Sequence, residues 1–222
     1  MIKGLRGLMP LRLPVCVAFV SVALVMSLMG TQAVAEDTRG KFLSRVREVY
    51  STLKDVKGQF KQTSRLKDLG KEMNFSGEFF IKIPNRLHWY YEGDQVQEVY
   101  VNDNVLVVYQ KKLSQAIRTR YDAQTMGQSP IALLSGLKDV DKHYDITERN
   151  GTLRLIPKKE FNSMKHFDIH PSESGFPIKK IVVTDLKDNE IEITLKDVRL
   201  NTNIIDETFT FTPPKDTKVV DN

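Results

Sequence analysis

The fold is decided by residues 79–91, which read FFIKIPNRLHWYY. On the two sides of Pro84-Asn85, one parity of positions is apolar throughout: Phe79, Ile81, Ile83, Leu87, Trp89 and Tyr91. An alternation with a period of two places alternate side chains on opposite faces of an extended chain. The stretch therefore predicts two β-strands joined by a short connection, each with one apolar face.

The same alternation recurs in short segments from residue 99 to residue 211. Its apolar members are Val99 and Val101, Leu106 and Val108, Leu153 and Leu155, Phe167 and Ile169, Ile181 and Val183, Ile191, Ile193 and Leu195, and Phe209 and Phe211. Turn-forming pairs such as Asn150-Gly151 and Asp188-Asn189 separate these segments. Strands joined by tight turns pair antiparallel, so we expect about ten antiparallel strands.

Two segments have the pattern of a helix instead. Between Asp37 and Leu53, apolar residues recur every three or four positions, as on one face of an amphipathic helix. The segment Ser129–Leu137 begins with a serine followed by proline, which is typical of a helix N-terminus. Its apolar stripe consists of Ile131, Leu134 and Leu137.

A sheet of about ten strands curls rather than staying flat, and its apolar side must be covered. The sequence therefore predicts a mainly β fold with short helices: a curved, antiparallel, half-closed β-barrel with a helical lid over an apolar cavity. No linker-like segment divides residues 36–222, so we expect one domain.

A half-barrel with a helical lid is also the shape of a carrier for acyl chains or other apolar ligands. We expect the cavity to be lined by the residues of apolar parity: Phe79, Ile81, Ile83, Leu87, Trp89, Tyr91, Val99, Val101, Leu106 and Val108. We expect the lid to contribute Ile131, Leu134 and Leu137.

Residues 1–35 have the pattern of a secretory signal peptide that is cleaved after about Ala35. Three cations precede an apolar stretch from Val15 to Met29, and Ala33-Val34-Ala35 is a small-residue cleavage site. Cleavage leaves 187 residues, lowers the formal net charge from +5 to +2 and removes Cys16, which is the only cysteine. We therefore expect an exported protein with neither a disulfide nor a thiol-based site, and little electrostatic reason to bind nucleic acid.

Motifs for catalysis and metal binding are weak. Residues Gly127–Ile131 lack the last glycine of a nucleophile elbow, and Ser129 is better explained as a helix cap. His166 and His170 alternate with apolar residues as on a strand, where four residues span about 13 Å, too far for two ligands of one ion. We expect no enzymatic activity, no metal and no cofactor.

Several motifs occur in an order that resembles the periplasmic outer-membrane lipoprotein carrier family, LolA. They are Phe60-Lys61-Gln62, a strand led by Gly77, the segment Ile83–Trp89, the segment Leu153–Lys158, and Phe209–Pro214. The resemblance extends from Phe42 to about Val219. It implies a monomeric shuttle in the periplasm that takes acylated lipoproteins from an inner-membrane ABC-type release complex to an outer-membrane acceptor.

The chain departs from the family at one position. The resemblance implies an arginine before the proline that holds the lid shut, whereas this chain has Ile83. We therefore expect closure of the lid to depend on apolar contacts from residues such as Ile131 and Leu134.

Two alternatives remain open. One is a related carrier or sensor of another lipid, such as a glycolipid or phospholipid. The other is a hydrolase that acts on lipids within the same cavity. The cargo bound in the periplasm separates the first alternative from a lipoprotein carrier, and ester turnover identifies the second.

Overall fold

The computed structural model describes residues 34–93, 97–121, 133–134, 137–158 and 164–222. The chain divides into two compact units, residues 1–34 and residues 35–222, and the second unit contains the whole sheet. The predicted signal peptide lies almost wholly outside the described residues and stays a prediction. Within those residues, no helix is both long enough and apolar enough to cross a bilayer.

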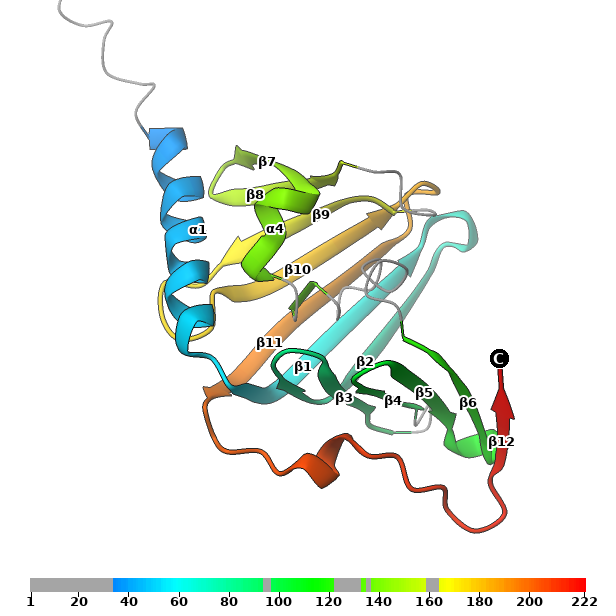
Figure 1. The fold of residues 1–222 in the computed structure, drawn as a ribbon. Helices are drawn as coiled ribbons and strands as arrows, with labels where there is room; N and C mark the ends of the chain where they lie inside the picture. The colour runs from blue at the N-terminus through cyan, green and yellow to red at the C-terminus, as the bar shows by residue number, and fades with distance from the viewer. Residues whose placement is uncertain (1–33, 94–96, 122–132, 135–136, 159–163) are drawn as a thin grey trace, which may run out of the picture. The chain divides into compact units, whose positions relative to one another are not determined.

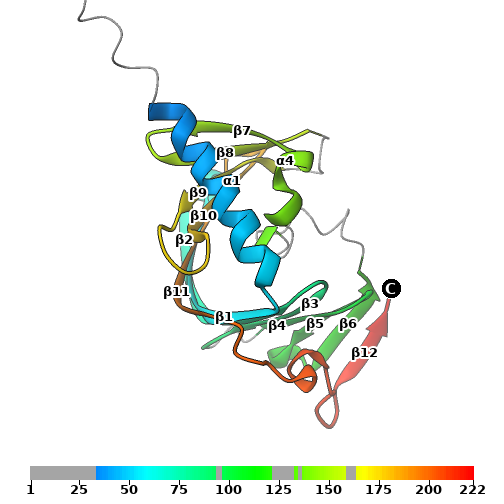
Figure 2. The same ribbon diagram turned by 60° about the vertical axis from the view of Figure 1, so that its left-hand side comes forward.

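The described strands form one sheet in the order β12-β6-β5-β4-β3-β2-β1-β11-β10-β9-β8-β7. Their bounds are β1 Asp55–Leu66, β2 Lys71–Lys82, β3 Arg86–Tyr91, β4 Gln97–Asn102, β5 Val105–Gln110, β6 Gln115–Arg120, β7 Tyr144–Arg149, β8 Thr152–Pro157, β9 Met164–Pro171, β10 Ile178–Asp185, β11 Glu190–Leu200 and β12 Lys218–Asp221. The sheet is strongly curved and open between β7 and β12 (Figures 1 and 2). This confirms the predicted curved, half-closed barrel, with twelve strands where about ten were expected.

The C-terminal part differs from the prediction. Among the described strands, β12 and β6 pair in parallel, and no strand forms at Phe209 and Phe211. The chain instead crosses the outer face of the sheet after β11, through the 3-10 helix Asp206–Phe209 (η4). Phe209 and Phe211 pack onto the sheet instead of joining it. Phe209 is fully buried, and the Phe211 ring contacts the rings of Tyr100 and Tyr109. The segment crosses the sheet and then turns back, so the chain runs in the same direction in β12 as in its neighbour β6.

The two described α-helices lie inside the curve of the sheet. The first, α1, spans Val34–Thr52, close to the predicted range, and α4 spans Val140–His143 (Figure 2). The other described helices are 3-10 turns at Lys67–Leu69, Lys111–Leu113 and Leu137–Asp139. The predicted helix Ser129–Leu137 lies mostly outside the described residues.

Among the described residues, the larger of two apolar core clusters lies between the concave face of the sheet and α1. From α1 it includes the side chains of Phe42, Val46 and Tyr50, and from the sheet the inward residues of both halves. Gly77 is needed within it because a Cβ atom there would lie 1.9 Å from the Tyr90 carbonyl oxygen and 2.8 Å from the Phe60 ring. The missing side chain lets the Phe60 ring lie across β2.

Candidate functional site

Aromatic rings occupy the centre of the concave face on β1, β2 and β3. The Phe60 ring stacks on the Trp89 indole with a centroid distance of 4.1 Å, and the Phe79 ring lies 5.6 Å from the same indole. The Tyr91 ring meets the Phe60 ring edge-on at 5.2 Å. Trp89 is completely buried. These rings lie on one face because side chains alternate strictly between the two faces along each of the three strands.

The ten residues predicted to line the cavity all belong to this one cluster. Phe79, Ile81, Leu87, Trp89, Val101 and Leu106 are fully buried. Ile83, Tyr91, Val99 and Val108 are partly buried and pack against the same cluster. The structure thus brings the predicted residues together on the concave face, while their contact with a ligand stays a prediction.

The prediction covered only one half of the concave face. Residues of β8 to β11 complete the apolar surface: Leu153, Leu155, Phe167, Ile169, Ile181, Val183, Ile193 and Leu195. Their alternation was visible in the sequence, but alternation alone does not tell which of two parities faces a helix. The pairing of β1 with β11 places both halves on one continuous surface.

The cover of the concave face consists of α1 and the residues around α4. Leu134 and Leu137 of the predicted lid are buried, together with Leu133 and Val140. Ile131 lies outside the described residues. Among the described residues, exposed polar contacts also hold this cover: the Arg47 guanidinium lies 3.2 Å from the Asp141 carboxylate, the Lys158 ammonium donates to the Asp141 carbonyl oxygen at 2.9 Å, and the Arg45 guanidinium donates to the Gly175 carbonyl oxygen at 3.1 Å.

One buried hydrogen bond adds to the apolar contacts expected of the lid. The Tyr50 hydroxyl donates to the carbonyl oxygen of Leu134. Burial raises the pKa of this hydroxyl, so the group remains a neutral donor. In the sequence Tyr50 counted only as an apolar position of the first helix, because its partner is 84 residues away. A link of this kind becomes visible only when the two segments are placed together.

Ile83 and Arg86 lie on opposite sides of the sheet. Ile83 packs at the margin of the concave cluster. The Arg86 guanidinium lies 2.8 Å from the Asp206 carboxylate of η4, on the outer face. Arg86 therefore binds the C-terminal segment. It does not replace the arginine that the family resemblance implies at position 83.

Polar side chains occupy one end of the concave face, toward the β1–β2 hairpin. The Tyr91 hydroxyl donates to Gln62 Oε1 at 3.0 Å, and Gln62 Nε2 donates to Ser64 Oγ at 3.0 Å. Burial raises the pKa of the Tyr91 hydroxyl, and its neighbours Trp89 and Gln62 partly offset that rise. The Trp89 indole N–H, although near Tyr91, makes no hydrogen bond with any described residue. Gln62 and Ser64 are not among the residues that the sequence predicts to line the cavity.

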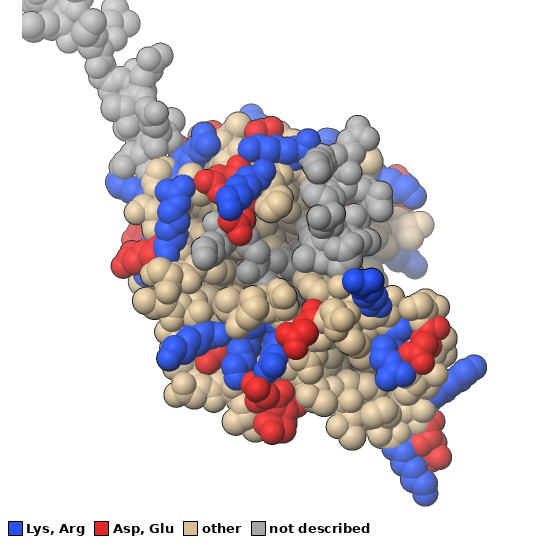
Figure 3. Space-filling model, viewed as in Figure 1, with Lys and Arg blue, Asp and Glu red and all other residues tan. Residues whose placement is uncertain are grey.

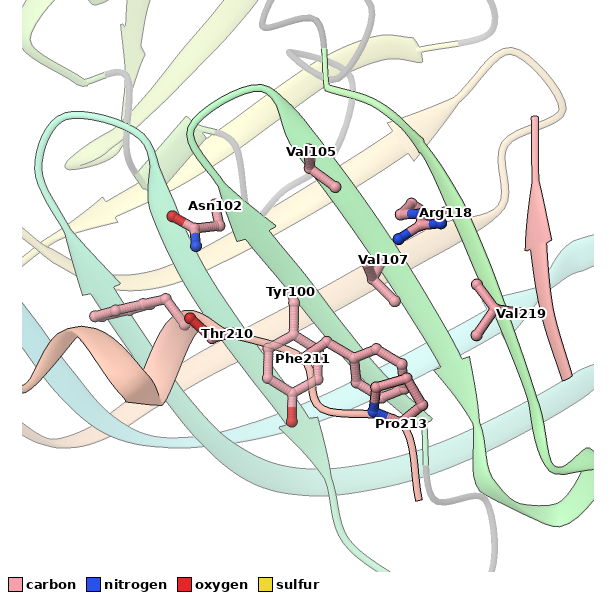
Figure 4. Close-up of a pocket in the computed structure, with 10 residues that line it drawn as sticks. Tyr100, Asn102, Val105, Val107, Arg118, Thr210, Phe211, Pro213 and Val219 are labelled. Carbon is pink, nitrogen blue, oxygen red and sulfur yellow. The ribbon is translucent and has the colours of Figure 1, made fainter. Parts of the chain in front are cut away.

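A separate pocket of about 250 Å³ lies on the outer face, between β4, β5, β6 and the C-terminal segment (Figure 4). It is lined by Tyr100, Asn102, Val105, Val107, Arg118, Phe209, Thr210, Phe211, Pro213 and Val219. The Arg118 side chain is held by two hydrogen bonds to the Asp221 carboxylate, at 2.6 and 3.0 Å. This small pocket lies where the C-terminal segment packs onto the sheet.

The histidines on β9 lie on the outer face of the strand that the sequence predicted. Asp168 lies between His166 and His170, and its carboxylate accepts two hydrogen bonds from Arg154 at 2.8 and 2.7 Å. Burial and the nearby Arg154 lower the pKa of His166. Among the described residues there is no group of His, Cys, Asp and Glu that could hold a metal ion. Cations and anions are interspersed on the face shown in Figure 3.

Comparison with known proteins identifies relatives over most of the chain. A family model described as outer membrane lipoprotein carrier protein LolA matches residues 51–212. The outer-membrane lipoprotein carrier protein of Halorhodospira halophila is 30% identical over 201 residues, which cover 87% of this chain and 89% of that protein. The protein of the same name from Helicobacter pylori is 29% identical over 197 residues, covering 88% and 94%.

Among solved structures, an uncharacterized conserved protein from Thermus thermophilus has a TM-score of 0.54. It is 10% identical and covers 83% of this chain and 99% of that one. At this level of identity the match shows a likeness of fold alone.

Proposed function

The chain belongs to the outer membrane lipoprotein carrier family LolA, and from this we propose that it binds the acyl chains of lipoproteins on its concave face and carries them through the periplasm. The carrier takes its cargo from an inner-membrane ABC-type release complex and delivers it to an outer-membrane acceptor. It acts as a monomer after removal of residues 1–35. No bond is made or broken during the transfer.

The observation that carries this proposal is the continuous apolar surface, which packs beneath a cover that contributes apolar side chains to the same cluster. Each methylene removed from water contributes about 0.8 kcal/mol, so an acyl chain of about sixteen carbons gains on the order of 10 kcal/mol when it is buried. Such a chain can replace the apolar contacts that α1 and the residues around α4 make with the sheet. The cover can then move aside without exposing the apolar face to water.

The proposal is tested by mass spectrometry of the material that co-purifies with the protein from the periplasm. We expect lipoproteins that are attached through their acylated N-termini. Free glycolipid or phospholipid alone would support a carrier or sensor of another lipid. Ester turnover that is lost on replacing a single serine or histidine would support a hydrolase.

Two valines on β5 provide a matched pair of variants for this experiment. Val108 packs against the concave cluster, whereas Val105 is 37% exposed on the opposite face of the same strand. Val108→Gln places an amide among the acyl contacts and should reduce the amount of bound lipoprotein. Val105→Gln should leave it unchanged. Equal loss in both variants would point to a general effect on folding.

A further inference from the structure

We propose that Trp89, Tyr91, Gln62 and Ser64 form a hydrogen-bonding site for the ester carbonyl oxygens of an acylated glycerol group. We call these four residues the polar track. The inference rests on the proposed function and adds a second element to it, since it assigns the position of the polar head of the acyl chains on the concave face.

The strand register places the four side chains in a row. Phe60 and Tyr91 both pair with Gly77 of the intervening β2, so β1 and β3 lie on either side of a strand that has no side chain at this level. Further along β1, Gln62 pairs with Phe75 and Ser64 with Met73. The track therefore runs from the aromatic centre of the concave face toward the β1–β2 hairpin. Beyond the centre, the apolar surface described above offers apolar contacts to the alkyl chains once the cover has moved aside.

The hydrogen bonds within the track leave two donors without an acceptor. Tyr91 donates to Gln62, and Gln62 donates to Ser64, so the chain of bonds ends at the Ser64 hydroxyl proton. Among the described residues, the Ser64 hydroxyl donates to no group, and the Trp89 indole N–H makes no hydrogen bond, although the Tyr91 hydroxyl lies near it. Ser64 is 7% exposed and Trp89 is fully buried. Buried donors without partners are rare because they lose their bonds to water and gain none in return.

The chemistry of these donors identifies the kind of ligand. An indole N–H only donates, and a hydroxyl that already accepts a bond from an amide donates its own proton. Both therefore require an acceptor. None of the four residues carries a charge, which favours a neutral acceptor over a carboxylate or phosphate. An acyl ester has a neutral carbonyl oxygen at the head of its alkyl chain, so it matches a site where donors adjoin an apolar surface.

The test compares two lipopeptides that differ only in the linkage of their alkyl chains to glycerol, one through esters and one through ethers. The ether lipopeptide keeps the apolar surface and lacks the carbonyl oxygens. We expect the ester lipopeptide to bind the unchanged protein about tenfold more tightly, which corresponds to the gain of one or two hydrogen bonds.

The variant that lowers the preference is Tyr91→Phe combined with Ser64→Ala. It deletes two hydroxyl groups and keeps the rings, the backbone and the Trp89 indole N–H. The preference for the ester should fall from about tenfold to about threefold in this variant, because one of the two unpartnered donors is lost, while the affinity for the ether lipopeptide stays the same. Tyr90→Phe is the matched control, because Tyr90 is the next residue on β3 and its side chain points to the other face. This variant should keep the tenfold preference.

The outcomes separate this inference from the proposed function. If the unchanged protein binds both lipopeptides equally well, the inference is overturned and the carrier function stands. If it binds neither, the proposed function fails and the inference fails with it. The comparison of the two lipopeptides on the unchanged protein requires no variant, so a variant that does not fold leaves the test decisive.

Discussion

Tyr50 is buried against Phe176 while its hydroxyl bonds to the Leu134 carbonyl, so one side chain both packs in the core and connects α1 to the cover. The bond joins neutral groups in an apolar environment. Ile83, at the position where the family resemblance implies an arginine, contributes only apolar contact. Among the described residues, the cover is therefore held by apolar packing, by this buried hydrogen bond and by the exposed contacts of Arg47 and Lys158 with Asp141.

Tyr50→Phe should weaken closure. The change removes the donor and leaves the Leu134 carbonyl without it, so the free energy of unfolding should fall by about 1 kcal/mol. If the bond stabilises mainly the closed form, a fluorescent apolar probe should bind up to about fivefold more tightly. Thermal melts and probe titrations check both effects. Tyr109→Phe, on the outer face, is the control and should leave probe binding unchanged. Loss of stability without a gain in probe affinity would mean that the bond has no part in closure.

Ile83→Arg should have the opposite effect. Ile83 is partly buried at the margin of the cluster, so a guanidinium there can extend toward the cover without entering the sealed core. Charge-assisted hydrogen bonds to backbone carbonyls contribute about 1.5–3 kcal/mol, which would stabilise the closed form. We expect the melting temperature to hold or rise while the affinity for an apolar probe falls. A lower melting temperature would show that the charge is left without a partner.

At the scale of elements, the C-terminal segment 201–217 is attached to the sheet at two places. At its start, the buried Asp55 carboxylate accepts hydrogen bonds from the backbone N–H of Thr202 at 2.7 Å and of Asn203 at 3.0 Å. In η4, Asp206 forms ion pairs with Lys82 and Arg86. The segment then covers the small apolar cluster Val107, Tyr109 and Ala116 on the outer face. It therefore protects a part of the sheet that the helices do not reach.

The pairing of Asp206 predicts a pH-dependent contribution to stability. Lys82 and Arg86 lower the pKa of Asp206 from 3.8 to about 2. A carboxyl group whose pKa is lower in the folded state stabilises the fold above its unfolded pKa and loses this effect as the pH falls toward the folded value. Asp206→Asn should therefore lower the melting temperature at pH 7.

The difference between the Asp206→Asn variant and the unchanged protein should shrink as the pH falls below about 4 and disappear once the pH is below about 2. Asp216→Asn, in an exposed turn of the same segment, is the control and should have little effect at any pH. A difference in melting temperature that is as large at pH 2 as at pH 7 would contradict the assigned role of the ion pairs.

For the molecule as a whole, the sequence was sufficient to predict which side chains of a strand share one face of the sheet. Phe79, Ile81, Leu87 and Trp89 could be assigned to one face because a strand with one buried face must alternate. The path of the C-terminal segment could not be predicted, because Phe209 and Phe211 alternate in the same way whether they pair in a sheet or pack onto one.

The polar track was missed for a related reason. Gln62 and Tyr91 are 29 residues apart in the chain, and their hydrogen bond follows from the register of β1, β2 and β3. Pairwise links of this kind depend on which strands become neighbours and in what register. Neither is determined by the local pattern of apolar residues.

Acyl chains that bind on the concave face must come close to Trp89, so its fluorescence reports their binding. Trp89 is the only tryptophan, lies at the centre of this face and stacks on Phe60. Titration with a triacylated lipopeptide should change its emission in a saturable way, because an acyl chain alters the contacts of the indole. Emission that stays unchanged at saturation, with binding shown independently, would contradict the account.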